Sequence, residues 1–554
     1  MKRFLHIGLV IAGLVVINLL AGLFPYRFDL TEDKRYTLSE AAVATVSDLQ
    51  SPITVDILMD GDLPAEFLRL QDEVMLLLDQ FKAENSRISY ALVDPLENPN
   101  NREQTLQSLQ RQGLKPANIT IQEEGETSQR LFFPWAIARQ GKKTVKVSLL
   151  KNTLGATTSE RINNSVQQLE YAFADAFTKL GLSDKKKIAV IKGNGELQDI
   201  YLADLLTDLK AYYNIGAITL ETVDRNPKAL LSQLQNFDLA LIAKPTSPFS
   251  DAEKYILDQF IVNGGKSVWL IDQVVMELDS LFNAKGSNMA VVRDLNLKDF
   301  FFKYGVRIEP ILLNDLYHTP IVVAAGEAND SQYNPFPWIY HPMVFSRQDH
   351  PINKNITPLR LQFANVIDTL QNSNTKSILL RSSPLSKKEG VPQSINLDQI
   401  NRIPKKEDYT NHEGYPLAVL LEGNFSSAFK NRIKPLQLPD AKEQGPDNSM
   451  LVVADGDIAK NQLKNGAPLE LGYDKWTNSF YGNKEFLMNS INYMLDDKGL
   501  MNIRNKKVEI PLLDVQKVVD QKSKWQLITI GIPVLFILLG AMVNRYLRQW
   551  RYGA

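Results

Sequence analysis

The side chains best suited to chemistry in this 554-residue chain are carboxylates, because the chain contains no Cys and only five His. Asp272 follows the apolar stretch 266–271, and Asp455 and Asp457 follow the apolar stretch 450–454. If both stretches are strands of one parallel sheet, the three acids could converge in a crevice at the carboxyl ends of the strands. Alternatively, they are solvated acids of ordinary turns.

The same edge of the sheet is expected to hold Asn194 and Glu196, which follow the stretch 187–191, and Lys244, which follows the stretch 239–243. We predict Asn194, Glu196 and Asp272 as ligand-binding residues, with a carbohydrate or a peptide as the ligand. Paired carboxylates can also act as general acid and base. Acid pairs are common, however, and the sequence does not give the distance between them, so we expect no catalytic residues.

Several kinds of chemistry are excluded by composition. Without Cys the chain cannot form disulfides, thiolate nucleophiles, Cys-ligated zinc sites or iron–sulfur clusters. No two His residues have the i, i+4 spacing of a helical zinc site. The formal net charge is −1, and acids and bases are mixed along the chain without a basic stripe. We therefore expect no metal, no cofactor and no nucleic-acid partner.

Two glycine motifs resemble nucleotide-binding motifs but lack essential parts. Residues 264–267 read GGKS, but a P-loop requires a Gly five residues before Gly265, where Phe260 stands. Gly193 and Gly195 form only a fragment of a dinucleotide fingerprint and are better explained as a tight turn after a strand. ATP hydrolysis is therefore expected in another chain.

Aromatic residues and prolines are concentrated in residues 332–341, QYNPFPWIYH. We predict Tyr333, Trp338 and Tyr340 as ligand-binding residues that could stack on a sugar ring or contact a partner. The alternative, that these rings belong to a core beneath a long loop, is left open.

The elements that must position these residues form two α/β domains. Residues 26–182 predict a βαβ unit, a helix, a run of β-strands and a final long helix, an order that resembles the thioredoxin-like fold. A Cys-x-x-Cys motif would precede the first long helix of a redox thioredoxin, but residues 60–66 read DGDLPAE. That segment is either a binding loop or acids that suit the amino end of a helix.

Residues 183–500 predict a second domain, in which apolar strands alternate with amphipathic helices. This pattern indicates a doubly wound parallel sheet that is covered on both faces. Residues from about 281 to 375 are less regular and are expected to form an inserted subdomain. Strands predicted near 377–381, 418–422 and 450–454 would complete the sheet.

Two apolar runs near the ends of the chain predict transmembrane helices. The first, residues 4–24, is longer than the ~7–15 apolar residues of a cleaved signal peptide, so we expect a signal anchor over residues 1–25, with a cleaved signal as the alternative. Asn18 within it is predicted to contact another membrane helix, or else to be a tolerated amide that faces lipid. The second predicted helix covers residues 525–546.

The remaining segments follow from these two spans. Residues 501–524 are expected to be a linker, and residues 547–554 a cytoplasmic tail. The short basic amino-terminal tail and the lack of Cys favour cytoplasmic termini, with the bulk of the chain in the periplasm or outside the cell.

Four segments, in this order between the two predicted spans, resemble a known family. Residues 35–81 begin RYTLSEAAVATVSDLQ, residues 186–199 read KKIAVIKGNGELQD, residues 338–356 read WIYHPMVFSRQDHPINKNI, and residues 363–368 read FANVID. The sequence is similar to the gliding-motility-associated ABC transporter auxiliary family, GldG, of the Bacteroidetes. The resemblance implies a protein of the bacterial inner membrane with a periplasmic bulk that assembles with an ABC permease and a cytoplasmic ABC ATPase.

The resemblance also implies that the second domain is similar to glutamine-amidotransferase-like domains, including one shared with intraflagellar-transport proteins, for which sugar or peptide binding has been proposed. Relatives often have GHGE where this chain has Asn194 in GNGE, and an amidotransferase needs a Cys nucleophile. We therefore expect a non-catalytic auxiliary subunit that binds a substrate or an envelope partner. The alternative is a free-standing anchored receptor for a carbohydrate or peptide.

Overall fold

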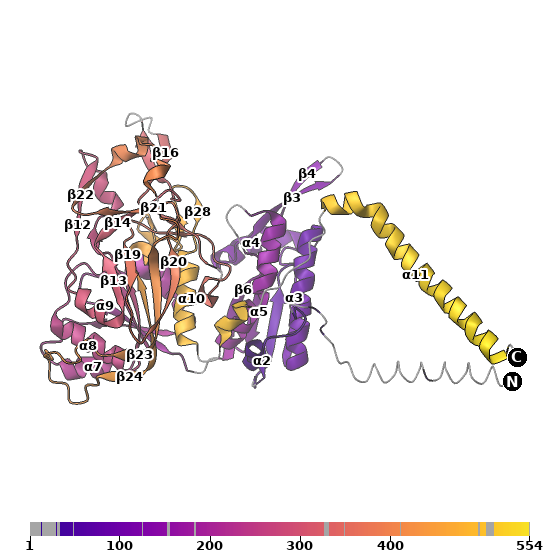
Figure 1. Cartoon of the computed structure of the whole chain (residues 1–554), viewed down its shortest axis with the longest axis horizontal. Coiled ribbons are helices and arrows are strands. Elements are labelled where there is room, and N and C mark those ends of the chain that lie inside the picture. Colours follow the sequence, from indigo (N-terminus) through magenta and orange to yellow (C-terminus); the bar gives the residue numbers. More distant parts are fainter. Residues whose placement is uncertain are drawn as a thin grey trace. The chain divides into compact units, whose positions relative to one another are not determined.

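The computed structural model describes residues 34–47, 49–61, 63–123, 126–151, 156–181, 184–325, 332–347, 349–409, 411–496, 499–505 and 515–552, together with residues 13, 29 and 31. The chain forms two units, Met1–Lys507 and Val508–Ala554. Figure 1 shows the elements of each unit along the chain. The predicted first span, and Asn18 within it, lie outside the described residues, apart from Gly13.

The first part of the larger unit contains a four-stranded sheet of order β2-β1-β5-β6. Its strands are β1 (Ile53–Ile57), β2 (Ile88–Leu92), β5 (Trp135–Gln140) and β6 (Lys143–Ser148). β1 and β2 are parallel, whereas β1–β5 and β5–β6 are antiparallel. The order of elements is thus the predicted βαβ unit, helix and β-strand run.

The run of β-strands in this part is divided at Pro134. Strand β4 (Glu126–Phe132) ends before this proline and β5 begins after it. Proline has no amide hydrogen to donate to a ladder and therefore interrupts a strand. As a result β4 pairs with β3 (Ala117–Glu123) in a hairpin of its own.

Helices α2 (Glu40–Val46), α3 (Ala65–Glu84), α4 (Arg102–Arg111) and α5 (Thr158–Gly181) complete this part. α3 and α5 are long amphipathic helices whose apolar side chains recur every three or four residues and are buried. Phe81 of α3 meets Phe177 of α5 edge-on, with ring centroids 5.1 Å apart. Ser39 caps α2 by accepting a hydrogen bond from the amide of Ala42.

The second part is organised around a seven-stranded sheet of order β20-β23-β24-β10-β9-β7-β8. Its strands are β7 (Lys187–Lys192), β8 (Asn214–Thr219), β9 (Leu239–Ala243), β10 (Lys266–Leu270), β20 (Thr375–Arg381), β23 (Pro416–Ser426) and β24 (Gln444–Val453). The five strands from β24 to β8 are parallel, but β23 and β20 are antiparallel to their neighbours. The expected purely parallel sheet is therefore mixed, because the described residues that connect β20 to β23 and β23 to β24 contain no crossover α-helix.

Both faces of this sheet are buried. Ile188 and Val190 of β7 pack in one hydrophobic cluster with α6 (Asp199–Leu209) and α10 (Asn483–Leu495). The intervening residues of β7, Ala189 and Ile191, pack in a second cluster with the remaining helices. Those helices are α7 (Pro227–Leu234), α8 (Asp251–Val262) and α9 (Lys298–Tyr304). Side chains of a strand alternate between faces, so one strand contributes to two cores.

Between β10 and β23 the chain forms several small antiparallel pairs. They are β11 (Val274–Val275) with β12 (Ser287–Val292) and β22 (Gln393–Asn396), β13 (Val306–Glu309) with β19 (Val366–Thr369), β14 (Ile311–Asp315) with β21 (Ser386–Gly390), β15 (Ile321–Ala325) with β16 (Gln332–Phe336), and β17 (Met343–Val344) with β18 (Leu359–Arg360). β21 and β22 lie beyond residue 375, where we expected the insertion to end.

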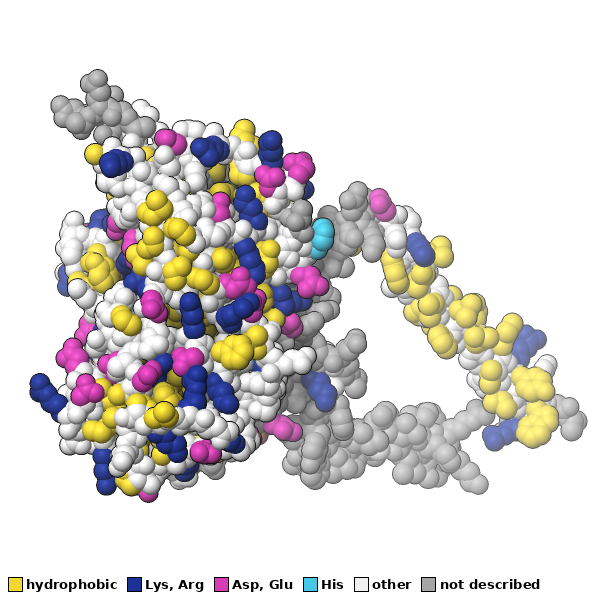
Figure 2. Space-filling view, turned by 60° about the vertical axis from the view of Figure 1, so that its left-hand side comes forward, with side chains coloured by type: hydrophobic (Ala, Val, Ile, Leu, Met, Phe, Trp, Pro, Cys, Tyr) yellow, Lys and Arg dark blue, Asp and Glu magenta, His cyan; other side chains and the backbone are white. Residues whose placement is uncertain are grey.

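The second unit contains one long helix, α11 (Val515–Tyr552). Its segment Asp520–Arg551 has a mean hydropathy of 2.3 in its most apolar window, is not buried, and is long enough to cross a membrane. Hydrophobic side chains run along this helix in Figure 2. The helix starts inside the segment 501–524 that we expected to be a linker, because Val515, Val518 and Val519 continue its apolar pattern.

Candidate ligand-binding site

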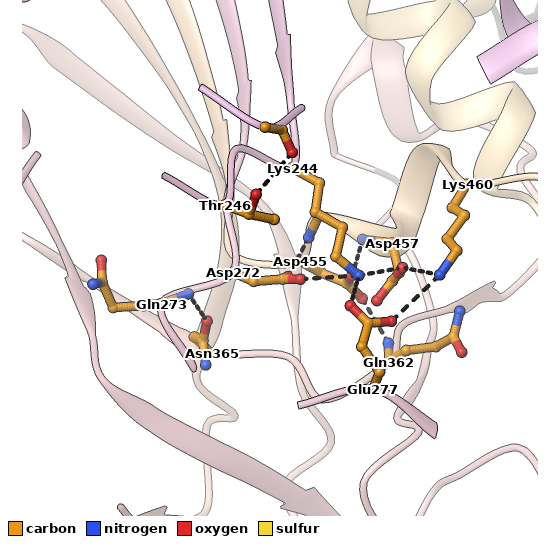
Figure 3. Close-up of polar contacts among 12 residues, drawn as sticks. Lys244, Thr246, Asp272, Gln273, Glu277, Gln362, Asn365, Asp455, Asp457 and Lys460 are labelled. Carbon is orange, nitrogen blue, oxygen red and sulfur yellow. Dashed lines mark hydrogen bonds and ion pairs between the residues drawn. The ribbon is translucent and has the colours of Figure 1, made fainter. Parts of the chain in front are cut away.

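Lys244 lies at the centre of the candidate site, directly after β9. Its backbone has a φ of 53°, a left-handed conformation that is uncommon for a residue with a side chain. Its amide donates to the carbonyl of Leu270 at 2.9 Å, and its side chain is only 3% exposed. Its ammonium nitrogen lies 2.6 Å from Oδ1 of Asp457 and 3.3 Å from Oδ2 of Asp272 (Figure 3).

The carboxylates around Lys244 come from three places in the chain. Asp272 follows β10, Asp457 follows β24, and Glu277 precedes the short helix η2 (Leu278–Leu281), with its Oε1 2.5 Å from the ammonium nitrogen. β9, β10 and β24 are parallel neighbours, so their carboxyl ends meet at one edge of the sheet.

Asp455 completes the cluster, and each of its oxygens accepts a backbone hydrogen bond. Oδ1 accepts from the amide of Asp457 at 2.7 Å, and Oδ2 accepts from the amide of Gln362 at 2.6 Å. Asp272, Asp455 and Asp457 are all buried. The three acids do converge, so the interpretation that they are solvated acids of ordinary turns was wrong.

Burial and mutual charge set the protonation of the cluster. Burial raises the pKa of Asp272 to about 6, against the opposing effect of Lys244. Burial raises the pKa of Asp455 well above its usual range, and the nearby charges of Asp272 and Asp457 raise it further. Burial alone would raise the pKa of Asp457, but Lys244 and Lys460 together lower it. Asp457 is therefore the carboxylate most firmly held in its charged form.

Three of these acids have the spacing of a metal site. Oxygens of Asp272, Glu277 and Asp457 lie within 4.8 Å of one another. The ammonium of Lys244 contacts all three, however, and supplies the positive charge that a metal ion would bring. Burial disfavours this charge, but the three acids outweigh that effect and raise the pKa of Lys244. These residues fit a buried ion-pair cluster better than a cation site.

A cavity of about 260 Å³ opens beside the cluster. Glu277 and Lys460 connect the cluster to the cavity, because both residues line the cavity. Oε2 of Glu277 lies 3.3 Å from the ammonium nitrogen of Lys460. The lining combines charged groups, amides and aromatic rings: Tyr201, Glu277, Asp279, Arg360, Gln362, Lys460, Asn461, Gln462, Lys475 and Trp476. Such a mixture suits a polar ligand with a flat apolar face.

An exposed aromatic pair marks the cavity. Trp476 lines it and is 55% exposed, and Tyr333 stacks on Trp476 with ring centroids 5.6 Å apart and an interplanar angle of 25°. The ammonium of Lys475 lies 5.1 Å from the centre of the Trp476 ring. Of the three aromatic residues predicted in residues 332–341, Tyr333 is thus the one beside the cavity.

The charges that line the cavity are largely paired within the protein. Arg360 places Nη1 3.4 Å from Oδ2 of Asp474 and Nη2 3.3 Å from Nδ1 of His341. Burial, with the nearby charge of Arg360, lowers the pKa of His341 well below its usual range. His341 is therefore neutral at physiological pH, and the arrangement favours a ligand without a strong net charge.

Asn194 and Glu196 occupy a turn at the same edge of the sheet, but neither is among the described residues that line the cavity. Asn194 is 3% exposed, and its amide donates to Oε2 of Glu196 at 2.9 Å. Its carbonyl accepts from the amides of Thr246 and Ser247. Burial raises the pKa of Glu196. In this structure the two side chains shape the turn, because their polar groups are directed toward the protein.

Trp338 and Tyr340 do not present a face to a ligand, contrary to the prediction. Each is 1% exposed, and their rings lie 5.5 Å apart in a hydrophobic cluster with Phe363. The hydroxyl of Tyr340 donates to Oε2 of Glu389 at 2.7 Å. Burial of the large apolar rings stabilises the small antiparallel strands around them, so these residues are core.

Sequence reasoning missed most of the cavity lining. Glu277, Arg360 and Trp476 come from short elements with no recognisable motif, and they meet only through the antiparallel pairs of the region after β10. The exposed Trp476, in a polar stretch, was the only local signal that could have been followed.

Two family models match parts of the chain. The model of a family described as an ABC-type uncharacterized transport system matches residues 185–490, more than half of the chain. A domain of unknown function, DUF7088, matches residues 32–139. No curated protein matches the sequence.

Among solved structures, the mmIFT52 N-terminal domain is similar at 10% sequence identity and a TM-score of 0.31, over 56% of this chain and 98% of that chain. The family is assigned from the match to the transport-system model. The chain belongs to this family of ABC transporter auxiliary proteins, described as an ABC-type uncharacterized transport system.

Proposed function

We propose that this protein is a non-catalytic, membrane-anchored auxiliary subunit of an ABC transport system that binds a neutral polar ligand, a carbohydrate, in the cavity beside Lys244. The observation that carries the proposal is the ammonium of Lys244, which three carboxylates surround. Because those acids form ion pairs with Lys244, we place the ligand in the cavity beside the cluster.

A binding role fits the cluster better than a catalytic role. A general acid or base must reach the proton that it transfers. Asp272, Asp455 and Asp457 are each no more than 6% exposed, and hydrogen bonds and ion pairs hold their oxygens. The hydroxyl of Thr246, which lies at this edge, donates to the backbone carbonyl of Gly195.

The cavity lining favours a sugar ring over a peptide. Trp476 and Tyr333 offer an exposed aromatic surface, on which the C–H face of a sugar ring can stack. Gln362, Asn461 and Gln462 add amide groups for hydroxyls. A peptide remains the second ligand class, and the same binding experiment separates the two.

The proposed setting is the bacterial inner membrane, with the bulk of the chain in the periplasm and the termini in the cytoplasm. α11 would pack against an ABC permease, and a separate cytoplasmic ABC ATPase would supply ATP hydrolysis. The sequence resemblance to the gliding-motility-associated family supports a role in gliding motility. Trp525 and Tyr546 flank the apolar run, as interfacial aromatic residues do.

Affinity purification of the full chain in mild detergent, followed by mass spectrometry, tests the transport role. A permease and an ABC ATPase recovered in amounts comparable to the tagged chain would support the proposal. Recovery of the chain alone would contradict it and would favour the free-standing anchored receptor.

Thermal denaturation with a panel of mono- and oligosaccharides and of peptides tests the binding role, because a ligand of the folded state raises the melting temperature. The variant Trp476→Ala should lose the shift, while Phe302→Ala, at a residue that is 62% exposed outside the cavity lining, should keep it. A shift that survives Trp476→Ala would place the ligand elsewhere.

A further inference from the structure

A second hollow, with a volume of about 610 Å³, shares no lining residue with the cavity beside Lys244. The segments that follow β14, β17 and β20 form its walls, together with residues 411–415 before β23. Its lining differs in chemistry from that of the first cavity and therefore points to a different ligand.

One wall of this hollow is apolar and open to solvent. Tyr317 is 48% exposed and Phe345 is 54% exposed, and their rings meet edge-on with centroids 6.2 Å apart. Met343 lies in the same lining. Exposed aromatic rings in a hollow with a polar rim are typical of a surface that a partner group covers.

The other groups give the hollow a positive charge. Arg347 and Arg381 line it, against Glu413 as the acid of the described lining. Arg347 places Nε 3.8 Å from Oδ2 of Asp349, which is too long for a hydrogen bond. Arg381 donates from Nη1 to the carbonyl of Gly414 at 3.0 Å, and its Nη2 makes no hydrogen bond among the described residues. Both guanidinium groups therefore retain donors for an anion.

The two serine hydroxyl groups in the lining already bond other groups of the protein. Oγ of Ser382 accepts from the amide of Tyr415 at 2.7 Å, and Oγ of Ser383 accepts from the amide of Leu385 at 3.0 Å while it also bonds Asp315. The described lining contains no Asn or Gln, whereas the first cavity has three such amides. A sugar needs neutral donors and acceptors of this kind, so an anion with an apolar body fits better.

Asp315 holds two parts of the hollow in place, the aromatic wall with Tyr317 and the loop with Ser383. It is fully buried at the end of β14, and its oxygens accept from the amide of Tyr317 at 2.8 Å and from the amide of Ser383 at 2.8 Å. One side chain therefore sets the aromatic wall and the serine loop relative to each other. Such preformed geometry is typical of a binding site.

We propose that this hollow binds the carboxyl end of a peptide chain whose last side chain is aromatic or aliphatic. The terminal carboxylate would pair with Arg347 and Arg381, and the side chain would pack on Tyr317 and Phe345. Capture of a chain terminus is a known mode of peptide recognition. A fatty acid fits less well, because the apolar wall consists of three side chains in one open hollow rather than a long tunnel.

Isothermal titration calorimetry on the full chain in detergent tests the proposal. The probes are N-acetylated tetrapeptides that end in Phe, Tyr, Leu or Val, each as the free acid and as the carboxamide. We expect at least one free acid to bind and its carboxamide to bind at least about tenfold more weakly, because a hydrogen bond to a charged group contributes about 1.5–3 kcal/mol.

Two variants and two matched controls locate the binding. Arg347→Gln and Phe345→Ala should each lower the affinity for the free acid about tenfold. Arg307→Gln and Phe302→Ala should leave the affinity for the free acid unchanged, because neither residue lines the hollow. They are matched controls, since Arg307 has the same 58% side-chain exposure as Arg347 and Phe302 is exposed to a similar extent as Phe345.

The proposal would be overturned if the free acid and the carboxamide bound equally, or if no free acid bound up to about 1 mM. It would also be overturned if the Arg347→Gln variant bound the free acid as well as Arg307→Gln does. A fourth contrary result would be displacement of the peptide by decanoate or glucuronate at equal concentration. The last result would assign the hollow to a lipid or an acidic sugar. None of these results bears on the first cavity, so failure here is distinguishable from failure of the proposed function.

Discussion

The ammonium nitrogen of Lys244 lies 2.6 Å from Oδ1 of Asp457, although 213 positions separate the two residues in the sequence. Both side chains are nearly fully buried, at 3% and 4% exposure. A buried ion pair is held by hydrogen bonds and further charges, and removal of one partner leaves the other charge uncompensated. This pair connects β9 to β24 across β10 and makes the site an integral part of the sheet.

Substitution of Lys244 by Met should destabilise the protein strongly. The change leaves Asp272, Glu277 and Asp457 without their shared cation, and the loss of one partner of a buried pair costs about 3–5 kcal/mol. The melting temperature, followed by circular dichroism, measures the effect. Lys115→Met is the matched control, since its side chain is 68% exposed in a pair with Glu470, and it should change the melting temperature very little. Equal melting temperatures for the two variants would contradict the role of Lys244.

The raised pKa of Asp272 implies that the stability of the protein depends on pH. Its folded-state pKa of about 6 lies above the value near 4 of an unfolded Asp. The folded state therefore binds more protons between pH 4 and 6, and the stabilising contribution, of about 2–3 kcal/mol, is present below pH 4 and lost as the pH rises through 6. Melting temperatures of the wild type and of Asp272→Asn across this range measure the difference.

The Asn variant keeps an oxygen for the amide of Gly456 but cannot titrate. We expect its melting temperature to depend less on pH between 4 and 6 than that of the wild type. Parallel curves for the two proteins would show that Asp272 titrates at an ordinary pKa.

Gly456 should not tolerate a side chain. A Cβ at this position would lie 2.5 Å from Cγ of Lys244, so Lys244 would have to move. Overpacking of this kind costs about 1–3 kcal/mol. We expect Gly456→Ala to lower the melting temperature and to weaken ligand binding in the adjacent cavity. Gly390→Ala is the control, because nothing lies within 4 Å of its Cβ. A Gly456→Ala protein as stable as the control would contradict the close packing.

A charge in the middle of α11 should prevent membrane insertion. Leu535 lies near the centre of the segment Asp520–Arg551. An Arg at the centre of a membrane helix costs about 2.5–3.5 kcal/mol. In a fusion of residues 508–554 to a soluble reporter, which lacks the predicted first span, the carbonate-resistant membrane fraction of Leu535→Arg should therefore fall. Ser523→Arg, near the start of the helix, should behave as the wild type. An unchanged membrane fraction for Leu535→Arg would mean that α11 does not cross the membrane.

The strands and helices around the site could be predicted because each has a strong local pattern. β9 matched its predicted range, 239–243. The convergence of Asp272 and Asp457 followed from the rule that parallel strands present their carboxyl ends at one edge. The failures lie where the pattern was ambiguous, as in residues 332–341, where aromatic rings suit either a ligand surface or a core.

The sequence by itself determined the alternation of strands and helices, the apolar helix near the carboxyl terminus and the absence of thiol chemistry. These features depend on residue type and on spacing within one element. Only the tertiary structure decided that Lys244 neutralises those acids, that Trp338 and Tyr340 are buried while Tyr333 stacks on Trp476, and that Arg347 faces an open hollow. Such contacts join residues far apart in the chain, and burial and charge pairing, which depend on these neighbours, cannot be read from local sequence.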